Sequence, residues 1–225
     1  MRNNTSVKLI AWSLPLIITL LPSCSPPPTS YIILCAGDSI TEVGYPPFLA
    51  RIIKEEGIRA RVVNKGKSGF NTKEYLDYLR ENKAELAESQ PDFILLQLGT
   101  NDVRADHDRT SADDFYTHMK EIIRLFRDFK TRTGRKPRIL LATIPPIPET
   151  TPFPFSSESA KRVTQEINPL IQKTAAEDKC TLVDNFSIFF RSPHLLPDVH
   201  PTDKGYQVLA QNWLAALKKG GIKEQ

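Results

Sequence analysis

Residues 92–102 read DFILLQLGTND, an apolar run that ends abruptly in small and polar residues. A strand with one face in water alternates apolar and polar side chains, but this run is apolar at nearly every position. It is therefore typical of a parallel strand whose two faces are both covered by helices. The run RILLAT at residues 138–143 has the same character. We expect residues 92–98 and 138–143 to be central strands of the domain.

The rest of the chain alternates between strand-like and helix-like segments. Further strands are expected at residues 31–36, 61–64 and 181–183, and helices at 46–56, 72–88, 112–130, 158–178 and 202–218. In residues 112–130 the large apolar side chains recur at spacings of three and four, which favours a helix with one face on the sheet. The alternating order predicts an α/β domain in which helices sandwich a central parallel five-stranded sheet. Its functional side chains should lie at the carboxyl ends of the strands.

The start of the chain has a different composition from the rest. Arg2 and Lys8 precede a mostly apolar run at residues 9–21, as in the charged and apolar regions of a signal peptide. The run ends in LLPSC, which resembles the lipobox of bacterial lipoproteins. Residues 1–23 are therefore interpreted as a lipoprotein-type signal peptide and Cys24 as the lipidated residue. An ordinary secretory leader and an uncleaved anchor are the alternatives.

Residues 24–30, with the proline-rich stretch SPPPTS, suit a stiff tether between a membrane and a folded domain at residues 31–220. The 225 residues are enough for one α/β domain, and 40% hydrophobic and 25% charged residues are typical of a globular protein. Because of the signal peptide, Cys24 and the tether, we expect an exported protein of the cell envelope that is anchored to a membrane by lipid. The formal net charge of +4 is small, and no nucleic-acid partner is expected.

Unusual residues lie at four places where the expected strands end or the last helix begins. GDS at residues 37–39 closes the first strand, NKGKSGFNT at 64–72 follows the second, and LGTND at 98–102 closes the third. DVH at residues 198–200 lies just before the last helix. Each is a weak signal by itself. In a parallel sheet, however, they would meet on one rim and bring together a serine nucleophile, hydrogen-bond donors and a histidine base.

These blocks resemble the motifs of the SGNH hydrolases, the group of GDSL esterases and lipases. AGDSIT, NKGKSGFNT, LGTND and DVHPTDKGY match its four blocks in order, within a resemblance that covers residues 31–217. The resemblance implies a flavodoxin-like α/β/α sandwich and ester hydrolysis through an acyl-enzyme intermediate. Position by position, it implies that Ser39 is the nucleophile and His200 the base. It also implies an oxyanion hole formed by the N–H groups of Ser39 and Gly69 and the Asn101 amide.

The last block departs from the family pattern in the spacing of its acid. The family usually has two residues between the acid and the histidine, whereas only Val199 separates Asp198 from His200. Residues two apart in an extended segment point to the same side, so Asp198 is interpreted as the acid of the triad. The alternative is a dyad of Ser39 and His200 in which Asp198 only shapes the turn. Asp184, at the end of the fifth strand, is the reserve acid.

Two other aspartates and two cysteines are expected to have supporting or structural roles. Asp38 and Asp102 should hydrogen-bond neighbouring loops and so support the nucleophile and the oxyanion hole. Cys35 and Cys180 lie beside apolar runs, where buried free thiols are the default, and a disulfide between them is the alternative. The four histidines show no H-E-x-x-H pattern, and the glycines form no phosphate-binding loop. Neither a metal nor another cofactor is therefore expected.

The type of reaction is easier to infer than the substrate. Residues 145–159, PPIPETTPFPFSSES, follow the fourth strand and are expected to wall one side of the cleft. Their aromatic rings would stack on sugars or accept a lipid chain, and ordinary packing within the loop is the alternative. Short connections leave little room for a lid or a long acyl tunnel. We therefore predict a serine esterase for short acyl groups, such as acetyl on a carbohydrate or envelope glycan. The alternatives are a lysophospholipase or thioesterase for longer chains, and a non-catalytic surface-anchored binding lipoprotein.

Overall fold

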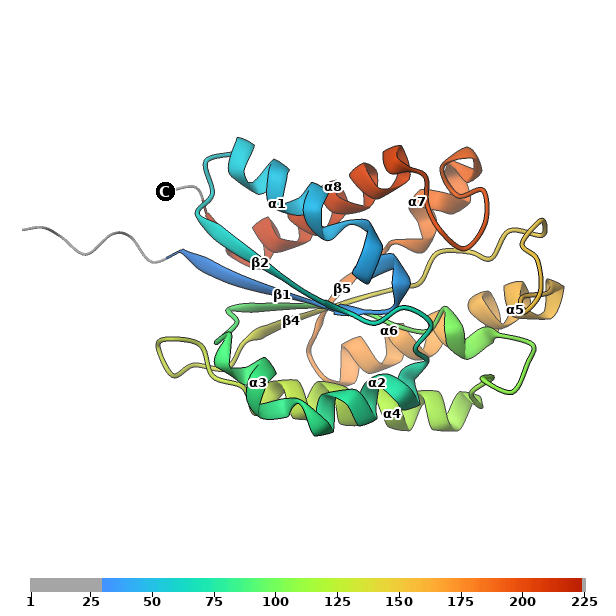
Figure 1. The fold of residues 1–225 in the computed structure, drawn as a ribbon, viewed down its shortest axis with the longest axis horizontal. Coiled ribbons are helices and arrows are strands. Elements are labelled where there is room, and N and C mark those ends of the chain that lie inside the picture. Colours follow the sequence, from blue (N-terminus) through green and yellow to red (C-terminus); the bar gives the residue numbers. More distant parts are fainter. Residues whose placement is uncertain (1–29, 224–225) are drawn as a thin grey trace, which may run out of the picture.

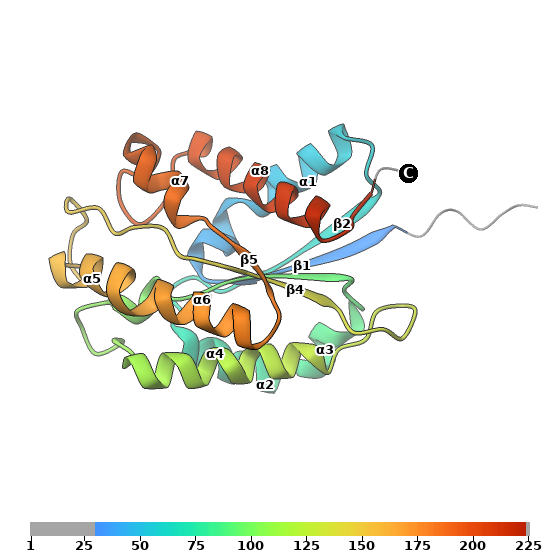
Figure 2. The same cartoon turned by 180° about the vertical axis from the view of Figure 1, so that it is seen from behind.

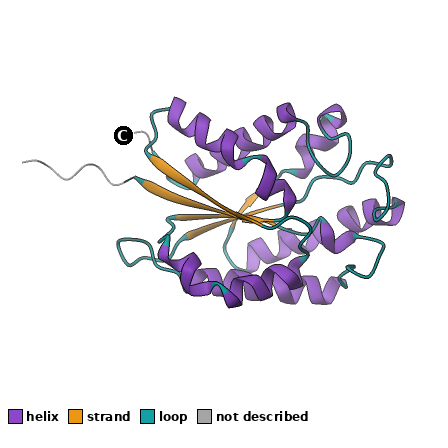
Figure 3. Cartoon of the chain, viewed as in Figure 1, coloured by secondary structure: helices purple, strands orange, loops and turns teal. Residues whose placement is uncertain are grey.

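Five parallel strands form the centre of the structure, a computed structural model that describes residues 30–223 (Figure 1). The strands are β1 (Tyr31–Gly37), β2 (Ala60–Gly66), β3 (Phe93–Gln97), β4 (Arg138–Ala142) and β5 (Thr181–Val183). Helices lie above and below the sheet (Figure 3), so the expected three-layer α/β/α sandwich with a parallel five-stranded sheet is confirmed. The predicted signal peptide, Cys24 and all but the last residue of the tether lie outside the described residues.

The inner strand β3 is apolar on both of its faces. Ile94 and Leu96 belong to the core on one side of the sheet, and Phe93 and Leu95 to the core on the other side. All four side chains are at most 3% exposed. Removing such a side chain from water contributes roughly 1.5–3 kcal/mol, so a strand of this composition is stable only between two layers. The interpretation of residues 92–98 as a central strand is confirmed.

Helices cover both faces of the sheet (Figure 2). One layer contains α2 (Thr72–Glu81), α3 (Lys83–Glu88), α4 (Ala112–Arg127), α5 (Ser157–Arg162) and α6 (Asn168–Glu177). The other contains α1 (Pro46–Glu55), α7 (Phe186–Arg191) and α8 (Asp203–Lys219). The apolar face predicted for residues 112–130 is buried against the sheet in α4. Within residues 30–223, none of the helices combines the length and the apolar character that crossing a bilayer requires.

Three helical details differ from the expectation. The helix expected at residues 72–88 divides at Asn82, whose backbone N–H and side-chain amide both donate to the Tyr78 carbonyl, at 3.0 and 2.9 Å. Local side-chain bonds of this kind favour helix ends over helix interiors. A π-helical turn, η3 (Val163–Ile167), joins α5 to α6. The short α7 was not expected, because its sequence FSIFFR consists largely of aromatic and β-branched residues with low helix propensity.

The strand order reverses direction at β1, next to the carboxyl ends of β1 and β3. Across the sheet the order is β2-β1-β3-β4-β5, so the chain first runs outward from β1 to β2 and then continues on the opposite side of β1. At such a reversal the loops after the two adjacent strands separate, and ligands of doubly wound sheets bind there. The register pairs Gly37 with Gln97, so Ser39 and Asn101 follow strand ends that lie next to each other.

Candidate active site

Ser39 lies at the start of a helical segment that follows β1 directly. This segment begins with the π-helical turn η1 (Ile40–Gly44) and continues into α1. The Asp38 carboxylate accepts the Ile40 N–H at 3.0 Å, which holds the turn. Gly37 is required because a Cβ there would lie 2.4 Å from the Gln97 carbonyl oxygen. The tight turn leaves the Ser39 side chain half-buried at the edge of the sheet.

The Ser39 hydroxyl lies within hydrogen-bond distance of His200. Ser39 Oγ and His200 Nε2 are 2.9 Å apart, although the two residues are 161 positions apart in sequence. His200 is held just before α8, where the Thr202 hydroxyl caps the helix by accepting the Gly205 N–H at 3.1 Å. An imidazole at this distance can take the hydroxyl proton during nucleophilic attack. The structure therefore brings the expected nucleophile and base together.

Asp198 contacts His200 in two ways that follow from its spacing. Its Oδ1 accepts a hydrogen bond from the backbone N–H of His200 at 2.6 Å. This is an Asx-turn, in which an aspartate side chain bonds the backbone two residues later. The same oxygen lies 3.4 Å from His200 Nδ1, which is longer than a good hydrogen bond. The two side chains are 50% and 46% exposed. Asp198 Oδ1 therefore lies near the imidazole ring, but its shorter contact is with the backbone N–H of His200.

Gly69 has a backbone N–H in the turn that follows β2. It lies in a turn in which the Phe70 N–H donates to the Lys67 carbonyl at 3.2 Å. Its φ is +81°, a left-handed conformation that glycine adopts without a steric penalty. Among residues 30–223 the Gly69 N–H has no hydrogen-bond partner, and no atom lies within 4 Å of where a side chain would be. This N–H can therefore donate to a ligand.

Asn101 begins the short helix η2 (Asn101–Val103), directly after the loop that follows β3. Its Nδ2 donates to the Phe70 carbonyl at 2.9 Å, and the side chain is buried. A primary amide has two N–H groups, so this contact orients the side chain and leaves a second donor. Because Phe70 adjoins Gly69, one bond connects the two loops that would supply the oxyanion-hole donors.

The Asp102 side chain also connects the Gly69 loop and the Asn101 loop. Its carboxylate accepts the Thr72 N–H at 3.1 Å and the Thr72 hydroxyl at 2.6 Å. Asn71, the N-cap of α2, donates its side-chain amide to the Asp108 carbonyl at 3.1 Å. Asp102 was expected to have a supporting role, but its partner was missed because Thr72 has the ordinary sequence context of a helix start. These contacts hold the Gly69 loop and the Asn101 loop together.

Burial changes the protonation of both supporting carboxyls. Removal from water raises the pKa of Asp38 to about 6, although the Ile40 N–H and the Thr100 hydroxyl favour its charged form. Removal from water also raises the pKa of Asp102, against the opposing effect of its bonds to Thr72. The two carboxyls also repel each other when charged, which adds to the raised pKa of Asp38.

Replacing Asp38 with Asn should make the protein's stability less sensitive to pH. Folding raises the Asp38 pKa from 3.8 to about 6, so the folded state binds this proton more tightly than the unfolded state. The resulting stabilisation is fully present below pH 4 and is lost as the pH rises through 6. Between pH 4 and 7 the free energy of unfolding of Asp38→Asn should therefore rise by up to about 3 kcal/mol relative to the wild type. Urea denaturation at each pH measures this difference, and a constant difference would contradict the prediction.

The other candidate residues lie outside this constellation. Asp184 Oδ1 accepts the Ser187 N–H at 3.0 Å and Oδ2 accepts its hydroxyl at 2.6 Å, so the reserve acid is engaged at the first turn of α7. Cys35 and Cys180 are free thiols, as expected by default. In the described part of the chain, no group of three or more His, Cys, Asp or Glu side chains is arranged to hold a metal ion.

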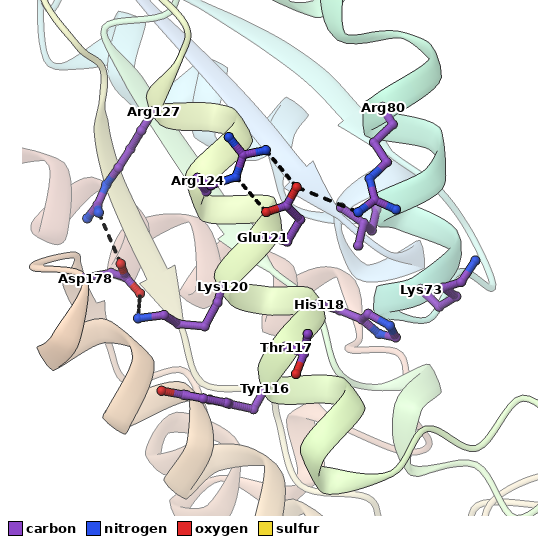
Figure 4. Close-up of a pocket in the computed structure, with 11 residues that line it drawn as sticks. Lys73, Arg80, Tyr116, Thr117, His118, Lys120, Glu121, Arg124, Arg127 and Asp178 are labelled. Carbon is purple, nitrogen blue, oxygen red and sulfur yellow. Dashed lines mark hydrogen bonds and ion pairs between the residues drawn. The ribbon is translucent and has the colours of Figure 1, made fainter.

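A cavity of about 800 Å³ is lined by residues of α2, α4 and the end of α6 (Figure 4), and Ser39 is not among them. Several cationic side chains line it, but acidic neighbours pair with them. Arg124 contacts Glu121 at 2.7 Å, while Lys120 and Arg127 contact Asp178 at 2.6 and 3.2 Å. Each of these three cations therefore has an acidic partner at close range.

A serine paired with a histidine at the carboxyl edge of a flavodoxin-like sheet, with hydrogen-bond donors on the neighbouring loops, defines a serine hydrolase. The chain belongs to the GDSL-like Lipase/Acylhydrolase family, whose model matches residues 35–208 and so includes every block described above. It is a carboxylic ester hydrolase. None of the curated proteins compared with the chain matches it.

Several solved structures share the fold. The acetylxylan esterase Axe2 from Geobacillus stearothermophilus is 20% identical with a TM-score of 0.66, over 83% of this chain and 94% of that one. The acetyl xylan esterase AlAXEase is 24% identical with a TM-score of 0.69, over 83% and 99%. LAE5, an α/β hydrolase from the metagenome of Lake Arreo in Spain, is 21% identical with a TM-score of 0.69, over 84% and 97%.

Proposed function

We propose that this esterase cleaves short acyl esters with Ser39 as nucleophile and His200 as base. The observation that carries this proposal is the 2.9 Å contact between Ser39 Oγ and His200 Nε2. As Oγ attacks the ester carbonyl carbon, Nε2 takes the hydroxyl proton, and the carbonyl oxygen becomes an anion. This anion accepts hydrogen bonds from the N–H groups of Ser39 and Gly69 and from the Asn101 amide.

The second half of the proposed reaction returns the enzyme to its starting state. When the tetrahedral intermediate collapses, the bond to the alcohol oxygen breaks and His200 gives its proton to the leaving alcohol. The acyl group remains on Ser39 as an ester. A water molecule, deprotonated by His200, then attacks this ester and releases the carboxylic acid. The proton returns from His200 to Ser39 Oγ, so atoms and charge balance over the cycle.

Two observations support an acetyl group on a carbohydrate as the substrate. Two of the structurally similar proteins are acetylxylan esterases. An apolar cavity of about 490 Å³ lies between residues 146–150 and 189–197, next to the segment that carries His200. One of its walls is Phe190, which is 68% exposed and stacks on Phe186 with ring centroids 5.6 Å apart. We assign this cavity to the sugar portion of the substrate.

A panel of esters tests the acyl preference. We expect kcat/KM for p-nitrophenyl acetate and acetylated xylo-oligosaccharides to exceed that for octanoyl or longer esters by about tenfold or more. Lysophospholipid and acyl thioesters complete the panel, and Ser39→Ala serves as the control for contaminating esterases. Faster hydrolysis of long-chain substrates would mean that the apolar cavity holds an acyl chain, and would favour the lysophospholipase or thioesterase alternative.

Asp198 is proposed as the acid that orients His200, with a smaller contribution than usual. Removing a well-aligned triad acid lowers the rate about 10⁴-fold, but this carboxylate is half exposed and 3.4 Å from Nδ1. We therefore expect Asp198→Ala to lower kcat/KM on the order of 10²-fold. Asp184→Ala is the matched control and should leave kcat/KM within about twofold. A rate for Asp198→Ala within a few-fold of wild type would identify a dyad of Ser39 and His200.

We also propose that the protein is exported and anchored through a lipidated Cys24. The sequence up to Cys24 supports this proposal, together with the proline-rich segment between Cys24 and the start of β1. Expression of the full chain followed by membrane fractionation tests it. Cys24→Ser should move the protein from the membrane fraction to the soluble fraction, whereas an unchanged distribution would favour an uncleaved anchor.

A further inference from the structure

Arg162, the last residue of α5, has its guanidinium buried beside the oxyanion-hole loops. The residue is only 2% exposed. Its Nη1 donates to the Asp102 carbonyl at 2.7 Å and its Nη2 donates to the Thr110 carbonyl at 2.6 Å. The Nε group donates to Glu166, one turn later, at 2.8 Å, which balances the buried charge. Each of the three guanidinium nitrogens therefore donates a hydrogen bond.

The two carbonyls are the two ends of one loop. The Thr110 N–H donates to the Asp102 carbonyl at 3.1 Å, which closes the loop at residues 102–110. A guanidinium is a rigid planar fork, so two bonds from it fix the relative position of both loop ends more firmly than a flexible ammonium would. Asn101 lies immediately before this loop and shares a peptide bond with Asp102. Its backbone position is therefore set by the clamp.

We propose that Arg162 is a positioning residue for the oxyanion hole, acting on Asn101 through the Asp102 carbonyl. The inference rests on the proposed role of Asn101. The Phe70 carbonyl orients the amide group of Asn101, but only the main chain determines where that amide stands relative to Ser39. A misplacement of about 1 Å at a catalytic group can lower a rate on the order of 10²-fold. Arg162 prevents that misplacement without touching substrate.

A double-mutant cycle between Arg162 and Asn101 tests this role. In the wild-type background, Arg162→Met should lower kcat on the order of 10- to 100-fold with KM for p-nitrophenyl acetate within about twofold. In the Asn101→Ala background the same change should lower kcat by less than about twofold, because the group that it positions is gone. Arg124→Met, on the exposed face of α4, is the matched control and should leave kcat unchanged.

Arg162→Lys keeps the charge and most of the side chain but loses the fork, so it should lower kcat less than Arg162→Met and show the same loss of effect in the Asn101→Ala background. It also carries the test if Arg162→Met does not fold. A full, additive loss in the Asn101→Ala background would overturn the inference, and so would near-wild-type kcat in the Arg162 variants. If Asn101→Ala itself keeps full kcat, then the proposed role of Asn101 fails, and this inference fails with it.

Discussion

Ser39→Ala is expected to lower kcat for acetyl ester hydrolysis on the order of 10⁶-fold while leaving the fold intact. The substitution removes the oxygen that we propose attacks the ester and carries the acyl group, and in the described part of the chain His200 has no other hydroxyl as a hydrogen-bond partner. The only hydrogen bond of the Ser39 side chain within the described residues is the one to His200, so its loss changes packing little. Hydrolysis of p-nitrophenyl acetate measures kcat, and a thermal melt followed by circular dichroism checks the fold.

A fluorophosphonate probe makes the same test independent of the choice of substrate. The wild type should be labelled at Ser39, and Ser39→Ala should not be labelled. Ser157→Ala, an exposed serine at the start of α5, is the matched control and should label like the wild type. Labelling of Ser39→Ala would assign the nucleophile to another residue. A wild type that neither reacts with the probe nor hydrolyses any ester would favour the non-catalytic binding lipoprotein.

Asn101→Ala should give the second largest effect, a loss in kcat on the order of 10²- to 10³-fold. In the proposed mechanism the missing amide is one of three donors to the developing oxyanion, a contact that is stronger in the transition state than in the bound ester. KM should therefore change much less than kcat. The free energy of unfolding should fall by only about 1 kcal/mol, because one hydrogen bond to the Phe70 carbonyl is lost.

Asn168→Ala is the control that separates catalysis from stability. Asn168 is another buried amide, and it both donates to and accepts from the backbone of Ile144, at 3.1 and 2.9 Å. Its removal breaks two hydrogen bonds, so it should destabilise the protein more than Asn101→Ala does but leave kcat nearly unchanged. Equal losses of kcat in the two variants would show that Asn101 acts through stability and not through the oxyanion.

The features predicted correctly from the sequence are those that local pattern determines. A continuous apolar run such as residues 93–97 has few stable positions other than an inner strand, and the alternation of such runs with amphipathic segments largely dictates the layers. The apolar runs end at Gly37 and just before Gly99, so the residues that follow are expected at the edge of the sheet. The places of Ser39 and Asn101 at neighbouring strand ends follow from that edge once the strand order is known.

The features missed depend on contacts between distant residues. Arg162 lies on a helix whose sequence gives no sign of burial, and its partners Asp102 and Thr110 are 60 and 52 positions away. The hydrogen bond that the Asp198 carboxylate accepts from the His200 backbone N–H is local. The distance from the same carboxylate to the His200 ring, however, depends on how α8 holds the turn. The division of the helix at Asn82 accompanies a side-chain hydrogen bond to the Tyr78 carbonyl that is made in addition to the backbone one.

The docking of the last helix also brings the two ends of the proposed catalytic pair together. Because α8 packs along α1, it returns the chain from β5 at the far edge of the sheet to the side where Ser39 lies. The strands β1 and β3 place Ser39 at the edge of the sheet, but the proposed base His200 is brought next to it only when α8 docks. We therefore expect a chain that ends before α8 to hydrolyse no ester, because His200 is then not held beside Ser39.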